Sequence, residues 1–405
     1  LPSENASTDE KLIQLMQDEA SKPDAVFFTH IHGDHIGLLE FIPEGVEVFI
    51  GELGKKMLDN INETLLGLAE LPEDERTSRL KKQKILNSST THFYEKFITD
   101  SFKDINFKAL PVDHSALDSY MLLFEVDGKV LLHTGDFRDH GRMGSSLYSD
   151  IEKLIAGKQV DILIIEGTTL GSTTHKNFTE AELTQEATKI LKEHPYAFLI
   201  CSSINIDALA SFYWAAVNST KGTDKKMALY CNSYVKKQLE LFTQEVGYAN
   251  DLWQYKFHRI YSLKPNLGGD LKGKTQEEHM LDNGFIMRIG VSDYYKSLVE
   301  RFKANDRGIK PILIYSMWEG YLTPGKPYTN QALIDFINSI GLEVIHLHTS
   351  GHATPETIAK VIKLVNPKEA IVPIHTEHAE GIKDLLANDD IAKIVKFGQD
   401  VVEVV

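Results

Sequence analysis

A short segment near the N-terminus, residues 29–35, carries three histidines and one aspartate directly after the apolar run Ala25–Phe28. Polar groups are costly to bury at a strand end unless one partner satisfies them together, and a divalent cation is the simplest such partner. The first two histidines alternate along one side of an extended segment and can bind one ion, whereas the aspartate and the third histidine follow a glycine bend and can reach a second. The pattern therefore predicts a metal site rather than a chance cluster of polar loop residues. The four candidate ligands are His30, His32, Asp34 and His35.

Further histidines and carboxylates follow other predicted strands. Apolar or alternating runs predict strands at 105–110, 129–133 and 161–165, and a residue of the same chemistry follows each of them. These residues are His114, Asp136 and Glu166. Two more histidines, His352 and His375, follow predicted strands near the C-terminus. Because rigid scaffolds present reactive groups at strand ends, this recurrence predicts that one site is assembled from distant parts of the chain.

The middle of the chain has a different pattern. From about residue 176 to 331, predicted strands and helices alternate, which indicates a parallel sheet covered by helices. Residues 52–105, by contrast, are mainly helical in pattern and strongly charged, and we expect a solvated insertion there. The dipeptide Asp127–Gly128 between two apolar runs predicts a two-residue hairpin loop.

Composition is that of an ordinary globular protein, with 405 residues of which 42% are hydrophobic. No stretch is apolar over the roughly 18 residues that a membrane span needs, and the acidic N-terminus lacks a signal-peptide pattern, so a cytoplasmic location is expected. Cys201 and Cys231 lie in apolar surroundings and are predicted to be buried, reduced thiols. A formal net charge of −15 argues against non-specific coating of nucleic acid, although a metal pair can itself bind phosphate.

With these residues, the chain resembles the metallo-β-lactamase superfamily, and within it the β-CASP nucleases, most closely the ribonuclease J group. The resemblance implies an α/β fold: an αββα metallo-β-lactamase sandwich with an inserted α/β domain, the β-CASP domain, that contains a parallel sheet. It implies residues 1–175 and 336–405 for the sandwich and residues 176–335 for the insertion. The matching motifs are His30-x-His32-x-Asp34-His35, His114, Asp136, Glu166, Ser350-Gly351-His352-Ala353 and Pro373-Ile374-His375.

The resemblance also implies a set of metal ligands. One zinc ion would be held by His30, His32 and His114, the other by Asp34, His35 and His375, and Asp136 would bridge the two. Imidazole and carboxylate ligands without a thiolate suit zinc or manganese. Two Zn²⁺ ions are therefore expected, with Mn²⁺ as the alternative.

Catalytic residues are implied by the same motifs. Two metal ions can bind a phosphodiester oxygen and activate a water, which Asp34 and Asp136 would orient. His352, which Glu166 would orient, is the candidate for supplying a proton or charge at the scissile phosphate.

Substrate contacts are implied at two places. Ser350 and the Gly351 amide would bind a phosphate next to the scissile one. The loop with Ser202 and Ser203 resembles the family's serine-rich nucleic-acid contact loop, but an isoleucine and an aspartate stand where basic or imidazole side chains are usual. This departure predicts that the chain handles an RNA backbone differently.

Two other departures concern the ends of the chain. The family places further strands before the central motif, so we expect that these strands are missing or replaced, and that the additional C-terminal domain of ribonuclease J is absent.

The remaining histidines are expected to have structural or supporting roles. His133, His346 and His348 lie inside predicted strands and are expected to be packed or hydrogen-bonded. His140, His175 and His378 are candidates for supporting the ligands.

Three functions fit these observations. The first is a ribonuclease J-like endo- or 5′-exoribonuclease that cleaves RNA phosphodiester bonds with a metal-activated water. The second is a small-molecule metallohydrolase acting on a lactone, thioester or cyclic phosphodiester, and the third is a non-catalytic RNA-binding subunit with a relic site. Single-stranded RNA is the expected partner, with no membrane contact. DNA as substrate and a homo-oligomeric state stay open, because nothing in the sequence tests for a 2′-hydroxyl or an interface.

Overall fold

The computed structural model describes residues 6–171, 178–246, 254–269, 271, 273–386 and 390–396. The chain divides into two compact units, one from Leu1–Lys176 together with Gly351–Val405 and one from Asn177–Ser350. Within the described ranges, no helix is both long enough and apolar enough to span a membrane.

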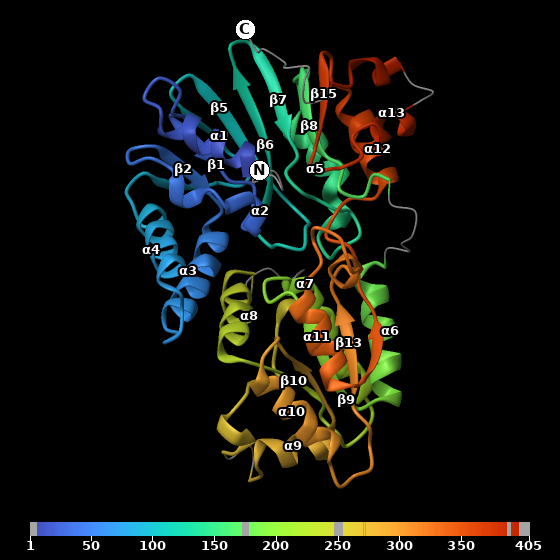
Figure 1. Ribbon diagram of the computed structural model, residues 1–405. Helices are drawn as coiled ribbons and strands as arrows, with labels where there is room; N and C mark the ends of the chain where they lie inside the picture. Colours follow the sequence, from blue (N-terminus) through green and yellow to red (C-terminus); the bar gives the residue numbers. More distant parts are fainter. Residues whose placement is uncertain are drawn as a thin grey trace. The chain divides into compact units, whose positions relative to one another are not determined.

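The first unit contains two β-sheets flanked by helices (Figure 1). Its strands are β1 (Ala25–Phe27), β2 (Glu47–Ile50), β3 (Thr91–Phe93), β4 (Thr99–Phe102), β5 (Ile105–Val112), β6 (Ser119–Val126), β7 (Lys129–His133), β8 (Ile162–Glu166) and β15 (Ala370–Ile374). Its helices are α1 (Ala6–Gln17), α2 (Gly33–Ile36), α3 (Glu52–Leu66), α4 (Glu73–Leu86), α5 (Leu147–Leu154), α12 (Pro355–Val365) and α13 (Gly381–Leu385). The small sheet is parallel with the order β1-β2-β3, and the larger sheet has the order β15-β8-β7-β6-β5-β4.

Aromatic side chains fill the space between the two sheets. Phe27 of β1 stacks on Phe49 of β2 with ring centroids 4.5 Å apart, and it meets Phe107 of β5 edge-on at 5.0 Å. Because side chains alternate along a strand, the intervening residues of β5 face the other way, where Leu110 and Val112 pack against α5 and α12. The first unit is therefore an αββα sandwich, as the family resemblance implies.

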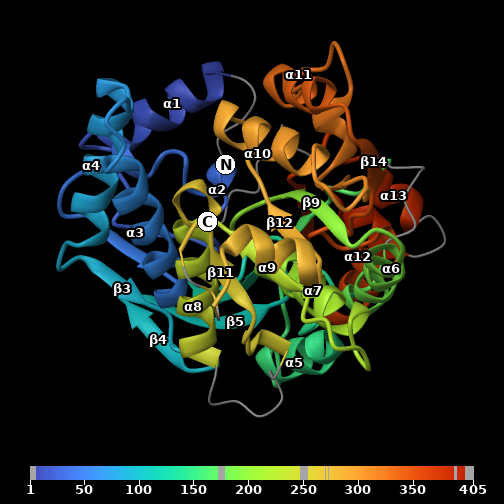
Figure 2. The same cartoon turned by 90° about the horizontal axis from the view of Figure 1, so that it is seen from below.

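The region 52–105 differs from the expectation of a solvated helical insertion. Helix α3 buries Leu53, Met57 and Leu58, and α4 lies beside it on the outside of the small sheet (Figures 1 and 2). The same region also supplies strands β3 and β4. Its charged residues are the exposed face of the outer helical layer, which is why charge alone suggested an insertion.

The hairpin predicted at Asp127–Gly128 is confirmed. Strands β6 and β7 pair antiparallel, with Val126 opposite Lys129. Both loop residues have positive φ, 51° at Asp127 and 73° at Gly128, which matches the twist of the flanking strands.

The second unit is built on a six-stranded sheet in which every pair is parallel. Its strands are β9 (Tyr196–Cys201), β10 (Ala228–Cys231), β11 (Ile260–Ser262), β12 (Phe285–Arg288), β13 (Ile312–Ser316) and β14 (Glu343–His346), in the order β11-β10-β12-β9-β13-β14. Its helices are α6 (Glu180–Glu193), α7 (Ile206–Ser219), α8 (Ser233–Val246), α9 (Gln276–Asn283), α10 (Asp293–Lys303) and α11 (Gln331–Ile340). Strands β9, β10 and β13 are buried along their whole length, as expected for a parallel sheet between helices. Cys201 and Cys231 are both buried and free, as predicted.

The second unit extends further than the sequence suggested. Strand β14 pairs parallel with β13 through Ile312 opposite Glu343 and three further pairs. Helix α11 packs against the same core through Leu333 and Phe336. The chain therefore leaves this unit after Ser350 rather than after residue 335, because α11 and β14 complete its sheet and one of its helical layers.

Candidate metal centre

Five strands of the first unit deliver the polar residues that the sequence singled out. The His-rich segment follows β1 and continues into the short helix α2, whereas His114, Asp136, Glu166 and His375 lie at or just after the ends of β5, β7, β8 and β15. His352 lies in the loop before α12. A backbone hydrogen bond of 2.9 Å from Tyr120 to Thr29 links the end of β1 to the larger sheet. The two sheets of the sandwich therefore meet where the ligands emerge.

Three histidines form the first group of candidate ligands. The Nδ1 atom of His32 lies 3.2 Å from Nε2 of His30 and 3.1 Å from Nε2 of His114. Two nitrogens bound to one tetrahedral zinc at the usual bond length would lie about 3.3 Å apart. His30 and His114 are almost completely buried. The nitrogens of the three rings thus already lie about as far apart as nitrogens that bind one metal ion.

Asp136 occupies the centre of the cluster. Its Oδ2 atom lies 3.1 Å from Nε2 of His35, 3.6 Å from Nε2 of His30 and 3.8 Å from Nε2 of His375. Asp136 is 1% exposed, yet neither of its carboxylate oxygens, nor Nε2 of His35, has a well-oriented hydrogen-bond partner within the described part of the chain. Buried polar atoms without such partners are expensive, and cations placed between the carboxylate and the rings would satisfy them.

The second group of candidate ligands is more exposed. His375 Nε2 lies 2.8 Å from Asp34 Oδ2, and His35 Nε2 lies 3.7 Å from the same oxygen. His375 has a φ of 54°, a left-handed conformation that is rare for a residue other than glycine and is typical of strained functional positions. The loop after β15 therefore holds this ring in place against its backbone preference.

The outer ring nitrogens of three candidate ligands have oxygen partners. Nδ1 of His114 lies 2.6 Å from the Gly351 carbonyl, Nδ1 of His30 lies 3.2 Å from the Thr29 hydroxyl, and Nδ1 of His375 lies 2.7 Å from the Thr168 hydroxyl. A carbonyl can only accept, so His114 carries its proton on Nδ1 and keeps Nε2 as a lone pair. Fixing the outer nitrogen in this way is characteristic of metal-ligating histidines.

Burial and neighbouring charges favour the protonation states that a metal requires. Burial lowers the pKa of His30 and His114 well below the ordinary value, and it lowers the pKa of His32 to about 4. Burial opposes the charge of Asp136, but the surrounding histidines outweigh it and hold the pKa of Asp136 well below its usual range. The first group is therefore a set of neutral imidazoles beside the ionised carboxylate of Asp136, which is what metal ligation needs.

Glu166 connects several loops of the site. It is completely buried, and its Oε1 atom accepts hydrogen bonds from the backbone N–H of Phe137 at 2.8 Å and of Ala353 at 3.4 Å. Its Oε2 atom lies 3.0 Å from His352 Nδ1 and accepts from the Thr168 hydroxyl at 2.9 Å. Glu166 thus fixes the residues that follow Asp136 and His352 in the chain.

His352 stands beside the cluster. Burial lowers its pKa, but the Glu166 carboxylate outweighs that effect and raises the pKa of His352 to about 9. Its Nδ1 atom lies 3.8 Å from Asp136 Oδ2, and its side chain is 20% exposed. His352 is therefore a cationic, partly accessible side chain next to the candidate metal ligands.

The residues predicted to contact substrate lie in two places. Gly351 belongs to the first unit, and a Cβ atom there would lie 2.3 Å from the Ser115 hydroxyl, so the loop can approach His114 only as glycine. Ser202, Ser203 and Ser350 belong to the second unit, the first two in the loop between β9 and α7 and the third after β14. A role of these residues in binding phosphate stays a prediction.

Sequence reasoning missed a buried ion pair that supports the cluster. Arg138 Nε lies 2.6 Å from Asp113 Oδ1, and neither side chain is exposed. The other Asp113 oxygen accepts from the Met143 backbone N–H at 2.6 Å. A signal was available, because Asp113 directly precedes His114 and Arg138 follows Asp136 by two positions, but an aspartate and an arginine near a motif are usually solvated.

The remaining histidines need less comment. His133 Nδ1 accepts from the Gly135 backbone N–H at 3.0 Å, and His346 Nδ1 lies 2.8 Å from Glu319 Oε1, so both are hydrogen-bonded as expected. The ring of His140 is nearly buried beside Asp139. His175 lies outside the described residues.

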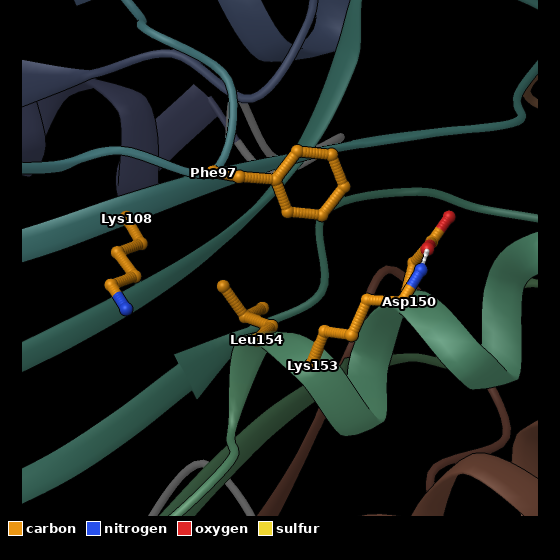
Figure 3. Close-up of a pocket in the computed structure, with 5 residues that line it drawn as sticks. All are labelled: Phe97, Lys108, Asp150, Lys153 and Leu154. Atoms are coloured by element: carbon orange, nitrogen blue, oxygen red, sulfur yellow. Dashed lines mark hydrogen bonds and ion pairs between the residues drawn. The ribbon is translucent and has the colours of Figure 1, made fainter.

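A cavity of about 460 Å³ lies elsewhere in the first unit (Figure 3). Phe97 and Leu154 lie on either side of it, Lys108 lies at one end, and the ion pair of Lys153 with Asp150 lies at the other. None of these residues is a candidate ligand. The chemistry of the first unit is therefore concentrated in the cluster around Asp136 rather than in this cavity.

Comparison with known proteins agrees with this geometry. Residues 5–198 match the family described as beta-lactamase superfamily domain, and residues 339–397 match the Zn-dependent metallo-hydrolase RNA specificity domain. A solved structure of a protein of unknown function from Enterococcus faecalis has the same fold, with a TM-score of 0.60 and 19% identity over 88% of this chain and 76% of that one. The chain belongs to the metallo-β-lactamase superfamily.

Within that superfamily it is a ribonuclease J-like protein of the β-CASP group. It is 22% identical to ribonuclease J of Helicobacter pylori over 379 residues, which are 87% of this chain and 47% of that protein. It is 23% identical to ribonuclease J of Mycoplasma genitalium over 381 residues, which are 89% of this chain and 58% of that protein. The chain thus spans about half the length of the curated relatives it matches.

Proposed function

We propose that the protein is a metal-dependent ribonuclease that cleaves RNA phosphodiester bonds. The observation that carries the proposal is the buried carboxylate of Asp136, which has no well-oriented hydrogen-bond partner in the described chain and stands between two groups of candidate ligands. The match of residues 339–397 to an RNA specificity domain and the similarity to ribonuclease J support RNA as the substrate.

The residues of the cluster fit two metal ions. His30, His32 and His114 would hold one ion, Asp34, His35 and His375 the other, and Asp136 would bridge them. Bound there, the ions would supply Lewis-acid stabilisation of a phosphate oxygen and a water nucleophile at neutral pH. The five imidazoles of the two groups favour two Zn²⁺ ions, with Mn²⁺ as the alternative.

The protein's own groups would orient and protonate the substrate. Asp34 and Asp136 would orient the attacking water, and protonated His352 would donate to the oxygen that leaves the phosphorus. Glu166 contacts no ligand position, so we assign it the role of positioning His352 and keeping it protonated. Ser350 and the Gly351 amide would bind the neighbouring phosphate.

The second unit would be the inserted β-CASP domain. Its loop with Ser202 and Ser203 leads into the buried helix α7, and a helix N-terminus favours an anion such as phosphate. Single-stranded RNA is the proposed substrate form, because bases must be free of a duplex for close contact with side chains. A cytoplasmic location agrees with two buried, free thiols. Endonucleolytic and 5′-exonucleolytic cleavage, and the number of subunits, stay open.

One observation favours a second candidate, a small-molecule metallohydrolase. The formal net charge is −15, and residues 202–207 contain no lysine or arginine. A lactone, thioester or cyclic phosphodiester would need less positive charge than a long RNA backbone. The complete set of ligands disfavours the third candidate, a non-catalytic RNA-binding subunit.

One experiment separates these functions. Purified protein loaded with zinc or manganese is incubated with 5′-monophosphorylated, 5′-triphosphorylated and circular RNA, with single-stranded DNA and with a lactone, next to the Asp136→Ala variant. Cleavage of RNA that the variant lacks supports the proposal, and circular RNA tests endonucleolytic action. Hydrolysis of the lactone with intact nucleic acid would overturn it.

A further inference from the structure

The hydroxyl of Thr168, in the loop after β8, touches three groups of the site. Its Oγ1 atom lies 2.7 Å from Nδ1 of His375, 2.9 Å from Oε2 of Glu166 and 3.1 Å from Nδ1 of His352. One of these groups is a candidate metal ligand, and the other two form the pair that the proposed function uses to protonate the leaving oxygen. A single hydroxyl therefore joins the candidate metal centre to the candidate proton donor.

The hydrogen-bond inventory fixes the direction of these contacts. A hydroxyl has one hydrogen to donate and two lone pairs to accept with, and an ionised carboxylate can only accept. Thr168 therefore donates to Glu166 Oε2, and its oxygen accepts from the ring nitrogen of His375. The Nδ1 atom of His375 must then carry the hydrogen of that contact.

This assignment determines what the other nitrogen of His375 can do. In the neutral ring, a hydrogen on Nδ1 leaves a lone pair on Nε2, and that atom lies 2.8 Å from Asp34 Oδ2, which is also an acceptor. Two acceptors at this distance need a hydrogen or a metal ion to bring them together: in the protonated ring a hydrogen on Nε2 donates to Asp34, and in the neutral ring a metal ion would take its place. Thr168 thus holds the neutral ring in the form in which Nε2 and Asp34 together bind a positive ion.

We propose that Thr168 is a positioning residue that fixes the ring tautomer of His375 and ties this ligand to the Glu166–His352 pair. The inference rests on the proposed function, because it assumes that the Asp34, His35 and His375 group holds an ion. It goes beyond that function in assigning one side chain to both tasks. Removing the hydroxyl would lower the affinity of this group for its metal ion. It would also remove a contact that holds the His352 ring in position.

Thr168→Val is the direct test, because valine has nearly the same shape and lacks only the hydroxyl. Thr168 is exposed, so the exchange leaves the core of the first unit unchanged. Thr168→Ser restores the hydroxyl without the methyl group. Thr64→Val is the matched control, because the Thr64 hydroxyl on α3 donates to the Asn60 carbonyl of its own helix, at 2.8 Å, and no candidate ligand belongs to that helix.

The first measurement does not depend on catalysis. Metal-free proteins are titrated with Co²⁺, whose absorption reports ligand geometry, and zinc affinity is measured by competition with a chelator. We expect Thr168→Val to lose about 10- to 100-fold in affinity for one of two ions, with a changed cobalt spectrum, as for other partners of metal-ligating histidines. Thr168→Ser should bind like the wild type, and Thr64→Val should not differ from it.

The second measurement is turnover at saturating metal, on the substrate that the wild type cleaves. Thr168→Val should lower kcat with little change in KM, because the hydroxyl is placed to act on the ligand and proton donor rather than on the substrate. Equal affinity for both ions in the wild type and Thr168→Val, with the same cobalt spectrum, would overturn the inference and leave the proposed function standing. A wild-type protein that binds fewer than two ions would instead overturn the two-metal function itself.

Discussion

Asp113 and Arg138 form an ion pair with no exposed side-chain surface, and each is one or two residues away from a candidate metal ligand. The pair joins the end of β5 to the loop after β7, because the Arg138 backbone N–H also donates to the Asp113 carbonyl at 2.8 Å. Gly141 packs so closely on Asp113 that a Cβ atom there would lie 2.0 Å from its carboxylate. The pair therefore helps to fix the distance between the chain segments that carry His114 and Asp136.

We predict that Asp113→Ala will destabilise the protein by about 3–5 kcal/mol, because it removes one partner of a fully buried ion pair and leaves the Arg138 charge buried without that carboxylate. Urea unfolding of the metal-free protein measures the loss. The ion pair of Asp150 with Lys153, whose side chain is exposed, provides the control, and Lys153→Ala should change the free energy of unfolding by less than about 0.5 kcal/mol. A loss below about 1 kcal/mol in Asp113→Ala would show that the buried pair adds little.

Gly351→Ala should displace His114 and lower the affinity for the metal ion that His30, His32 and His114 would hold. The new Cβ would lie 2.3 Å from the Ser115 hydroxyl and 2.6 Å from the Ser115 Cβ, so the loop must move, and its carbonyl would move away from His114 Nδ1. Zinc content per chain and chelator competition measure the effect, expected to be about 10- to 100-fold in affinity. The double variant Ser115→Gly with Gly351→Ala removes the clash and should recover most of the affinity. No recovery would mean that the clash is not the cause.

The pairing of His352 with Glu166 predicts a pH dependence of stability. The pKa of His352 is raised from 6.5 to about 9, so the pairing stabilises the folded protein fully below about pH 6.5 and its contribution is lost as the pH rises through about 9. Between pH 7 and 9.5 the metal-free wild type should therefore lose roughly 2–3 kcal/mol more than Glu166→Gln does. Urea unfolding at both pH values tests this, and parallel curves for the two proteins would contradict it.

Removal of the metal should lower the unfolding temperature of the wild type. A ligand that binds only the folded protein stabilises it by about 2.7 kcal/mol when present at 100 times its dissociation constant. Thermal unfolding with a chelator, and again after zinc is restored, measures this contribution. Asp136→Ala should respond much less to either treatment, because it lacks the carboxylate that both groups of ligands face. An equal response in the two proteins would place the metal elsewhere.

The cluster of candidate ligands could be predicted from sequence, and from the family that it resembles, because its residues lie at or just after strand ends. His30, His32, Asp34 and His35 are nearly contiguous, and three structural groups of the cluster contain at least one of them. The Asp127–Gly128 hairpin could also be predicted from the sequence, since its turn conformation depends on these two residues.

What the sequence concealed depends on contacts between distant residues. The charged residues on the outer faces of α3 and α4 suggested a solvated insertion. The two helices instead cover the small sheet, because the few apolar residues on the inner face of α3 determine the packing. Strand β14 could not be assigned to the second sheet before its pairing with β13 was known. Thr168 carried no signal, since a threonine after an acidic residue is common and only the fold brings it to His375.

The order in which the ligands appear along the chain has a consequence for how the site is completed. His375 directly follows β15, which pairs with β8, and the Gly351 carbonyl that contacts His114 also comes after the second unit in the sequence. At a synthesis rate of about 5–20 residues per second, the nascent protein waits roughly 12–48 s between making Asp136 and making its last ligand. During that interval the cluster of candidate ligands is incomplete, so the metal ions that it would hold are selected only after β15 has paired with β8.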